Sequence, residues 1–146
     1  MKDKIIENNI KEFGWHCLNV FYPDDGKPEF TYSIGFEETY NHPEIMMFGL
    51  EADKSHHMLA DIAHDIKNGV ILKTDVRLKN VIGGDYEVMF KEIKQESFGQ
   101  YLGTAVDYYE KPFRAWVMLW PDKHNILPTE SGCLATDQNE ALGIII

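Results

Sequence analysis

Two short apolar segments on either side of a turn sequence constrain this chain most. Residues 15–22 are rich in aromatic and branched side chains, while Phe30, Tyr32 and Ile34 alternate with polar residues. Between them, residues 23–26 read Pro-Asp-Asp-Gly, in which each residue type favours a turn. The pattern predicts a β-hairpin, and a hairpin makes this part of any sheet antiparallel.

The remaining periodicities predict further strands and three helices. Helical spacing covers residues 3–13 with Gly14 as the C-cap, residues 54–68 with Asp53 or Ser55 as the N-cap, and a stretch from a Ser97–Gln100 capping box that Pro112 ends. Strand patterns cover residues 44–50, 72–79, 86–90 and 113–120. The order α-βββ-α-ββ-α-β predicts an α+β domain with a mainly antiparallel sheet and two or three packed helices, with a split-barrel-like sheet as one form it could take.

Length and composition predict one soluble domain in the cytoplasm. The 146 residues contain no repeat or linker, so residues 1–146 are treated as a single domain. The first residues turn acidic before an apolar signal region forms, and no apolar run approaches the ~20 residues of a membrane span. The two cysteines, Cys17 and Cys133, are far apart in sequence, as expected for a reducing compartment.

The charge balance bears on the partner. With 24 acidic and 14 basic residues the formal charge is −10, which argues against nucleic acid because phosphate binding needs clustered Lys and Arg. An acidic surface steers towards a basic protein instead. The apolar end at residues 144–146 would be exposed on a monomer unless it packs on its own domain, and this favours a homodimer.

Two short motifs carry the candidate catalytic groups. His42 and Glu44 flank Pro43 at a predicted strand end, where an imidazole and a carboxylate could exchange a proton. A loop-closing hydrogen-bond network is the simpler interpretation of that motif. Asp122 ends a Trp-Pro-Asp triplet that also occurs on the acid loop of protein tyrosine phosphatases, but neither cysteine here is followed six positions later by Arg. Asp122 is therefore expected to brace its loop.

A helical triplet provides the candidate metal ligands. His57, Asp61 and His64 fall within one arc of the predicted helix, and imidazole with carboxylate suits Zn²⁺ or Fe²⁺. The arc lies opposite the apolar stripe of Leu59, Ile62, Ala63 and Ile66. A solvated helix face is therefore the favoured interpretation, with no metal site.

Five motifs in order carry a family resemblance: Phe13-Gly14-Trp15-His16, residues 23–26, residues 32–36 (Tyr-Ser-Ile-Gly-Phe), His42-Pro43-Glu44 and Trp120-Pro121-Asp122. Together they resemble a widespread bacterial family known as domain of unknown function 4262. The resemblance implies a small cytosolic bacterial protein and no particular reaction. It singles out Trp15, His16, Tyr32 and Trp120 as the positions to examine first for ligand binding. Where the family tends towards Phe-Pro-Trp, this chain has Leu127-Pro128-Thr129, a departure that predicts an altered site.

Two functions from different classes follow. The first is a non-enzymatic ligand- or protein-binding module of an interaction or immunity type, whose partner is a basic protein or a small molecule. The second is a flavin- or metal-dependent enzyme that uses a cleft near His42 and Glu44. The residues identify no cofactor.

Overall fold

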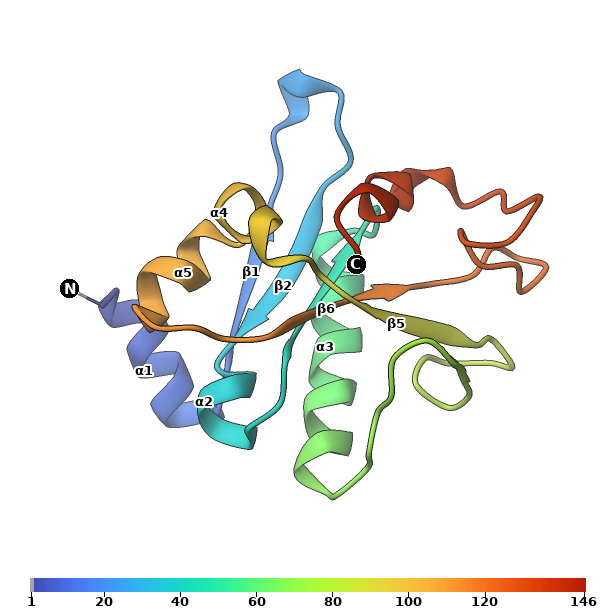
Figure 1. The fold of residues 1–146 in the computed structure, drawn as a ribbon. Coiled ribbons are helices and arrows are strands. Elements are labelled where there is room, and N and C mark those ends of the chain that lie inside the picture. Colours follow the sequence, from blue (N-terminus) through green and yellow to red (C-terminus); the bar gives the residue numbers. More distant parts are fainter. Residues whose placement is uncertain (1) are drawn as a thin grey trace.

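The computed structural model describes residues 2–146, and Figure 1 shows their arrangement. The helices are α1 (Lys4–Phe13), α2 (Phe36–Tyr40), α3 (Ala52–Lys67), α4 (Phe98–Tyr101) and α5 (Gly103–Tyr109), with 3-10 helices η1 (Pro23–Asp25), η2 (Gln95–Ser97) and η3 (Thr136–Gly143). The strands are β1 (His16–Val20), β2 (Phe30–Ile34), β3 (Glu44–Phe48), β4 (Arg77–Leu78), β5 (Val88–Glu92) and β6 (Ala115–Leu119). No helix within residues 2–146 is long and apolar enough to cross a membrane.

The six strands form one open sheet in the order β1-β2-β3-β6-β5-β4. β3 and β6 are parallel, and every other neighbouring pair is antiparallel. The mainly antiparallel α+β fold is therefore confirmed. The split-barrel form is wrong, because β1 and β4 lie at opposite ends of the sheet and each pairs with only one neighbour.

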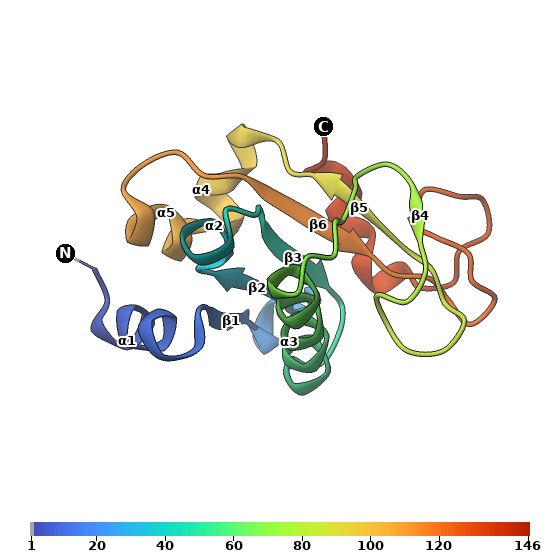
Figure 2. The same cartoon turned by 90° about the horizontal axis from the view of Figure 1, so that it is seen from below.

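Apolar side chains fill both faces of the sheet. One core contains Ile6 and Ile10 of α1 together with residues of α4 and α5, and the other contains Leu59, Ile62 and Ala63 of α3. Figure 2 shows α3 on one side of the sheet and α4 and α5 on the other. Alternation divides each strand between these cores, since Met46 and Phe48 of β3 belong to the first and Ile45 and Met47 of β3 to the second.

Helix α1 confirms the predicted opening helix and its C-cap. Asp3 caps its start, because Oδ1 accepts hydrogen bonds from the N–H groups of Ile5 at 2.8 Å and Ile6 at 3.2 Å. Gly14 ends it with φ +90°, and its N–H donates to the carbonyl of Ile10. A Cβ at this position would lie 2.7 Å from the hydroxyl oxygen of Tyr40, so the close approach of α2 also favours glycine.

Two predicted helix starts are wrong in detail. Helix α3 begins at Ala52 after Glu51, which makes no side-chain cap, and Ser55 lies inside the helix fully buried. The Ser97–Gln100 capping box does not form either. The predicted third helix instead divides at Leu102 into α4 and α5, and with the short α2 this gives five α-helices in residues 2–146 where two or three were expected.

The predicted strand at 72–79 is also wrong over most of its length. Only Arg77 and Leu78 form a strand, because Asp75 and Asn80 adopt φ values of +66° and +64° that interrupt the extended backbone on both sides. Thr74 adds only an isolated β-bridge to Phe90 of β5. Alternating polarity therefore identified a half-buried segment but not its backbone conformation.

The apolar C-terminal end packs mainly on its own domain. Ile144 is buried in the first core and Ile145 forms a β-bridge with Ile93, while Ile146 remains exposed. The tail itself therefore gives no reason to expect a homodimer.

Candidate functional site

Glu44, the first residue of β3, is a buried carboxylate surrounded by donors. It is only 1% exposed. Its oxygens accept hydrogen bonds from the Ser33 hydroxyl at 2.8 Å, from the backbone N–H groups of Gly35 at 3.2 Å, Phe36 at 3.0 Å and Glu37 at 3.0 Å, and from the Tyr109 hydroxyl. Five donors on one buried carboxylate leave no free face for a substrate.

The backbone donors identify what Glu44 does. Gly35 to Glu37 form the start of α2, whose N-cap residue Gly35 has no side chain to satisfy these groups. Glu44 therefore caps α2 from the neighbouring strand β3. Its negative charge is also stabilised by the positive end of the α2 helix dipole. Burial raises the pKa of Glu44 to about 7, although the hydrogen bonds from Tyr109, Glu37 and Ser33 oppose that change. The geometry favours a structural role for Glu44 over a catalytic one.

His42 lies nearby but shares no hydrogen bond with Glu44. Its Nδ1 donates to the carbonyl of Pro43 at 2.8 Å, and its ring stands edge-on to Trp116 with centroids 5.0 Å apart. Burial lowers the pKa of His42, so the ring is neutral near pH 7 with a lone pair on Nε2. That Nε2 is buried without a hydrogen-bond partner. The acid–base pair expected of the motif is therefore not assembled.

Trp120 and Asp122 follow the C-terminal end of β6, whereas Glu44 lies at the N-terminal end of β3, the parallel strand beside it. The indole N–H of Trp120 donates to the carbonyl of Phe48 at 2.8 Å. Asp122 accepts from the N–H groups of His124 at 2.9 Å, Ile126 at 3.0 Å and Leu134 at 2.8 Å, which lower its pKa. The expected role of Asp122 as a brace for its loop is confirmed.

Tyr32 and the histidine triplet lie apart from the other predicted site residues, and Tyr32 lines a separate cavity of about 300 Å³. Tyr32 is buried in the first core and lies against Gly103 and Thr104 at the start of α5. His57, Asp61 and His64 are exposed on α3, as the solvated-face interpretation predicts. Among residues 2–146 no group of three or more His, Cys, Asp or Glu is arranged to hold a metal ion.

Trp15 and His16 are the two predicted ligand-binding residues that the structure brings together. They line a cleft of about 410 Å³ between α1, β1 and α3, which we call the edge cleft because β1 is an edge strand. The seven lining residues are Asn9, Phe13, Trp15, His16, Cys17, His56 and Ala60. Sequence reasoning missed Asn9, Phe13, Cys17, His56 and Ala60. The sequence contained one indication of this cleft. β1 carries apolar residues on both faces, although one face of an edge strand normally contacts water.

The polar groups of the edge cleft suit binding. The Trp15 ring meets the His56 ring edge-on at 5.7 Å and the Phe36 ring at 5.5 Å, so these rings form an aromatic wall. Asn9 Nδ2 donates to Nδ1 of His16 at 2.9 Å, which leaves Nε2–H as a donor, and burial lowers the pKa of His16. Burial raises the pKa of Cys17 to about 11, so this thiol stays protonated and is a poor nucleophile.

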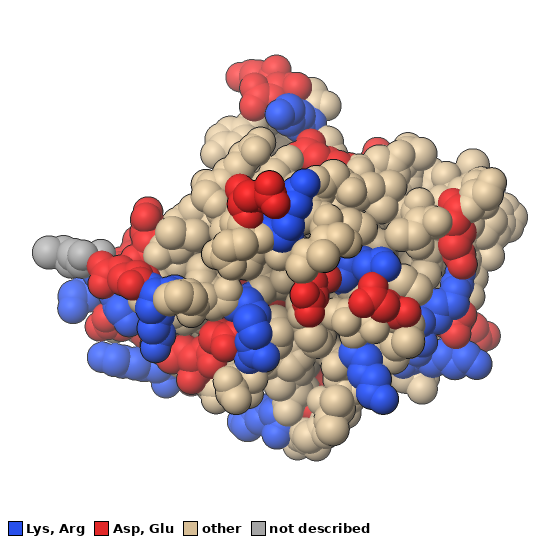
Figure 3. Space-filling view, viewed as in Figure 1, with Lys and Arg blue, Asp and Glu red and all other residues tan. Residues whose placement is uncertain are grey.

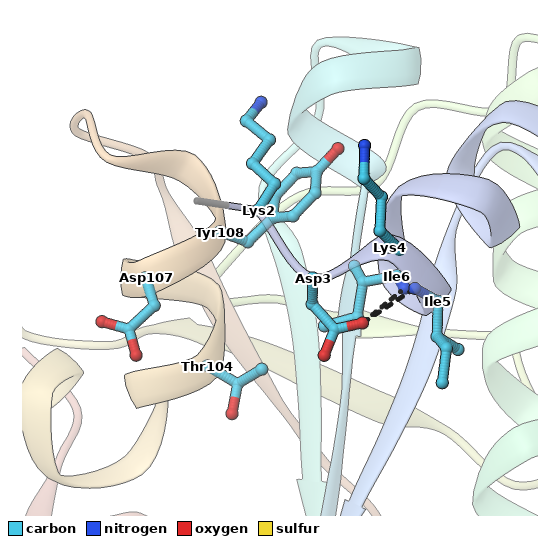
Figure 4. Close-up of a pocket in the computed structure, with 8 residues that line it drawn as sticks. All are labelled: Lys2, Asp3, Lys4, Ile5, Ile6, Thr104, Asp107 and Tyr108. Atoms are coloured by element: carbon cyan, nitrogen blue, oxygen red, sulfur yellow. Dashed lines mark hydrogen bonds between the residues drawn. The ribbon is translucent and has the colours of Figure 1, made fainter.

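A second cavity lies between the start of α1 and α5, as Figure 4 shows. It has a volume of about 550 Å³. The chain itself uses several of its polar groups, because Asp3 caps α1, the Lys2 ammonium lies 4.6 Å from the centre of the Tyr108 ring and Tyr108 donates to Glu38. The edge cleft therefore remains the stronger candidate site.

The fold and the cleft define a small α+β domain with an open sheet and a partly apolar site at one sheet edge. The model of the family described as domain of unknown function (DUF4262) matches residues 9–134. The chain belongs to this family. Neither curated proteins nor solved structures gave a match.

Proposed function

We propose that the protein is a non-enzymatic binding module and that the edge cleft is its binding site. The observation that carries this proposal is the convergence of Trp15, His16 and Cys17 from β1 with His56 from α3 around one cleft. Aromatic walls with a few polar groups are the usual composition of a binding site. Of the polar groups present, the ring nitrogen Nδ1 of His16 is already engaged by Asn9 and the Cys17 thiol stays protonated, which favours recognition over nucleophilic chemistry.

The charge supports a basic protein as the partner. The formal charge of −10 attracts cationic partners over a distance. Figure 3 shows acidic and basic side chains interspersed over one face, with acidic atoms gathered at the tip of the β1–β2 connection, where Asp24 and Asp25 lie. The net negative charge of the whole protein therefore attracts the partner, and the edge cleft provides the specificity. As part of this proposal we place the protein in the bacterial cytoplasm, which is consistent with two free cysteines.

Site-specific photo-crosslinking in the host tests this function. A benzophenone amino acid at Ala60, inside the edge cleft, is expected to give a discrete adduct that mass spectrometry identifies as a protein rich in Lys and Arg. The same group at His57, on the exposed face of the same helix, is the matched control. Absence of an adduct at Ala60, or equal adducts at both positions, would overturn the proposal.

One observation supports a cofactor-using enzyme as a second candidate. The unpartnered Nε2 of His42 is buried beside Trp116, where a bound group could donate a hydrogen bond to its lone pair. Titration of the purified protein with riboflavin 5′-phosphate, and separately with Zn²⁺, tests this candidate. Unchanged flavin fluorescence and unchanged metal content would remove it.

A further inference from the structure

We propose that the edge cleft receives an extended, Lys- or Arg-bearing segment of another protein, which adds to β1 as a seventh strand. This inference rests on the proposed binding function and specifies its mode. It follows from three features of β1, which are its free backbone groups, the helices beside it and its lack of edge protection.

The hydrogen-bond register shows which backbone groups of β1 are free. The N–H of Gly49 donates to the carbonyl of Glu29 at 2.8 Å, so Glu29 and Thr31 direct their backbone groups towards β3. The residues between them, Phe30 and Tyr32, direct theirs towards β1. These pair with Val20 and Leu18. Alternation then directs the N–H and C=O groups of Cys17 and Asn19 away from the sheet, and within residues 2–146 these groups have no protein partner.

The cleft lies around this free edge. Helix α1 supplies Asn9 and Phe13 on one face of the sheet, and α3 supplies His56 and Ala60 on the other. Figure 2 shows these two helices on either side of β1. A strand added to β1 would therefore project alternate side chains against the two helices, which is how peptide-binding domains read a strand at a sheet edge.

β1 also lacks the features that normally block an edge. Its sequence His-Cys-Leu-Asn-Val contains no Lys, Arg or Pro. The opposite edge is protected in the usual ways, since β4 has only two residues, Arg77 and Leu78, and Lys79 follows them. The protein protects the β4 edge of its sheet and leaves the five-residue β1 edge open. This difference indicates that the β1 edge serves binding.

Charge selects the occupant. One carboxylate lies at the open edge, that of Glu29, which accepts from the Asn19 side chain at 2.9 Å, and the whole chain has a formal charge of −10. No Lys, Arg, Asp or Glu lines the cleft itself. An added strand with Lys or Arg at the rim and apolar residues against Phe13 and Trp15 matches this pattern. A second copy of this chain would instead bring two charges of −10 together.

Peptide binding with a matched pair of variants tests the inference. The probes are synthetic peptides of about seven residues, long enough to span β1, with Lys or Arg alternating with Val, Leu, Phe or Tyr. Asn19→Pro removes the outward N–H, whereas Asn19→Ala removes the same side-chain contacts and keeps that N–H. We expect the best peptide to bind Asn19→Ala about tenfold more tightly than Asn19→Pro. Amide exchange at Cys17 and Asn19 should slow on binding, with little change at Leu18.

Four results would overturn strand addition: no basic peptide binding better than its Glu counterpart, equal binding by the two variants when both are folded by circular dichroism, unchanged exchange at Cys17 and Asn19, or a dimer that Asn19→Pro dissociates, which would make a second copy the occupant. Failure of this inference is distinguishable from failure of the binding function. A crosslink at Ala60 that persists in Asn19→Pro would retain the function and exclude the added strand.

Discussion

The hydroxyl of Tyr109 donates to the buried carboxylate of Glu44, joining two residues that are 65 positions apart in sequence. The same carboxylate caps α2, so a single buried group connects α5, β3 and α2. Tyr109 is at the end of its helix, and both burial and the Glu44 charge raise its pKa, which keeps the hydroxyl protonated as a donor.

Removing the Glu44 carboxylate should destabilise the fold strongly. Glu44→Ala removes the acceptor that five donors share, and only the Gly35 N–H keeps another, the Tyr109 hydroxyl oxygen at 3.0 Å, so we expect a loss of about 3–5 kcal/mol in the free energy of unfolding. Glu44→Gln keeps one acceptor oxygen and should cost less. Urea unfolding measures both, with Glu12→Gln as the exposed control. A loss in Glu44→Ala no larger than in the control would contradict the capping role.

Glu44 should also make stability depend on pH. Its pKa is raised from 4.5 to about 7 in the folded state, so above pH 4.5 the unfolded chain releases this proton before the folded one does. Between these pH values the unfolded state binds fewer protons than the folded state. The contribution of Glu44 to the free energy of unfolding therefore falls as the pH rises from about 4.5 to 7. The wild type should lose stability over this range relative to Glu44→Gln. Parallel pH profiles of the two proteins would refute the assignment.

The Cys17 thiol should react slowly and in a pH-dependent way. Because its pKa is raised to about 11, only a small fraction is thiolate near neutral pH. The rate of iodoacetamide labelling, followed by mass spectrometry, should rise continuously from pH 7 to 10 without a plateau. Cys17→Ser identifies the signal and leaves Cys133 as the internal reference. A plateau below pH 9 would show that the thiol is not buried as described.

Asp122 should hold the segment after β6. In Asp122→Ala the N–H groups of Ile126 and Leu134 lose their acceptor, and their amide hydrogens should exchange faster than in the wild type. Asp122→Asn retains one acceptor oxygen and is expected to lie between the two. Hydrogen exchange measured by NMR checks this, with the amides of α3 as the unaffected reference.

Local patterns predicted most of the regular elements. The β1–β2 hairpin, α1 with its Gly14 cap, and the buried stripe of α3 all depend on contacts within one element or between neighbours. The failures were at α2, at the start of α3, at the division between α4 and α5, and around β4. α2 has only five residues and is capped by Glu44 from another element, while Asp75 and Asn80 interrupt the strand that alternation predicted.

The candidate site was predicted only in part. Trp15 and His16 were singled out, but their cleft is completed by Asn9 and Phe13 from α1 and His56 and Ala60 from α3. Tyr32 and Trp120 were singled out equally and lie elsewhere. Tyr32 lies beneath α5, and Trp120 is hydrogen-bonded to the carbonyl of Phe48. The side-chain identities alone did not separate these cases.

The sequence by itself determined the α+β class, the antiparallel hairpin and the strongly acidic character, because periodicity, turn chemistry and charge are local or additive properties. Only the tertiary structure decided that Glu44 is a helix cap and that β1 is an open edge between two helices. Both depend on which distant segments come into contact, and long-range packing selects those contacts from many that the local patterns allow.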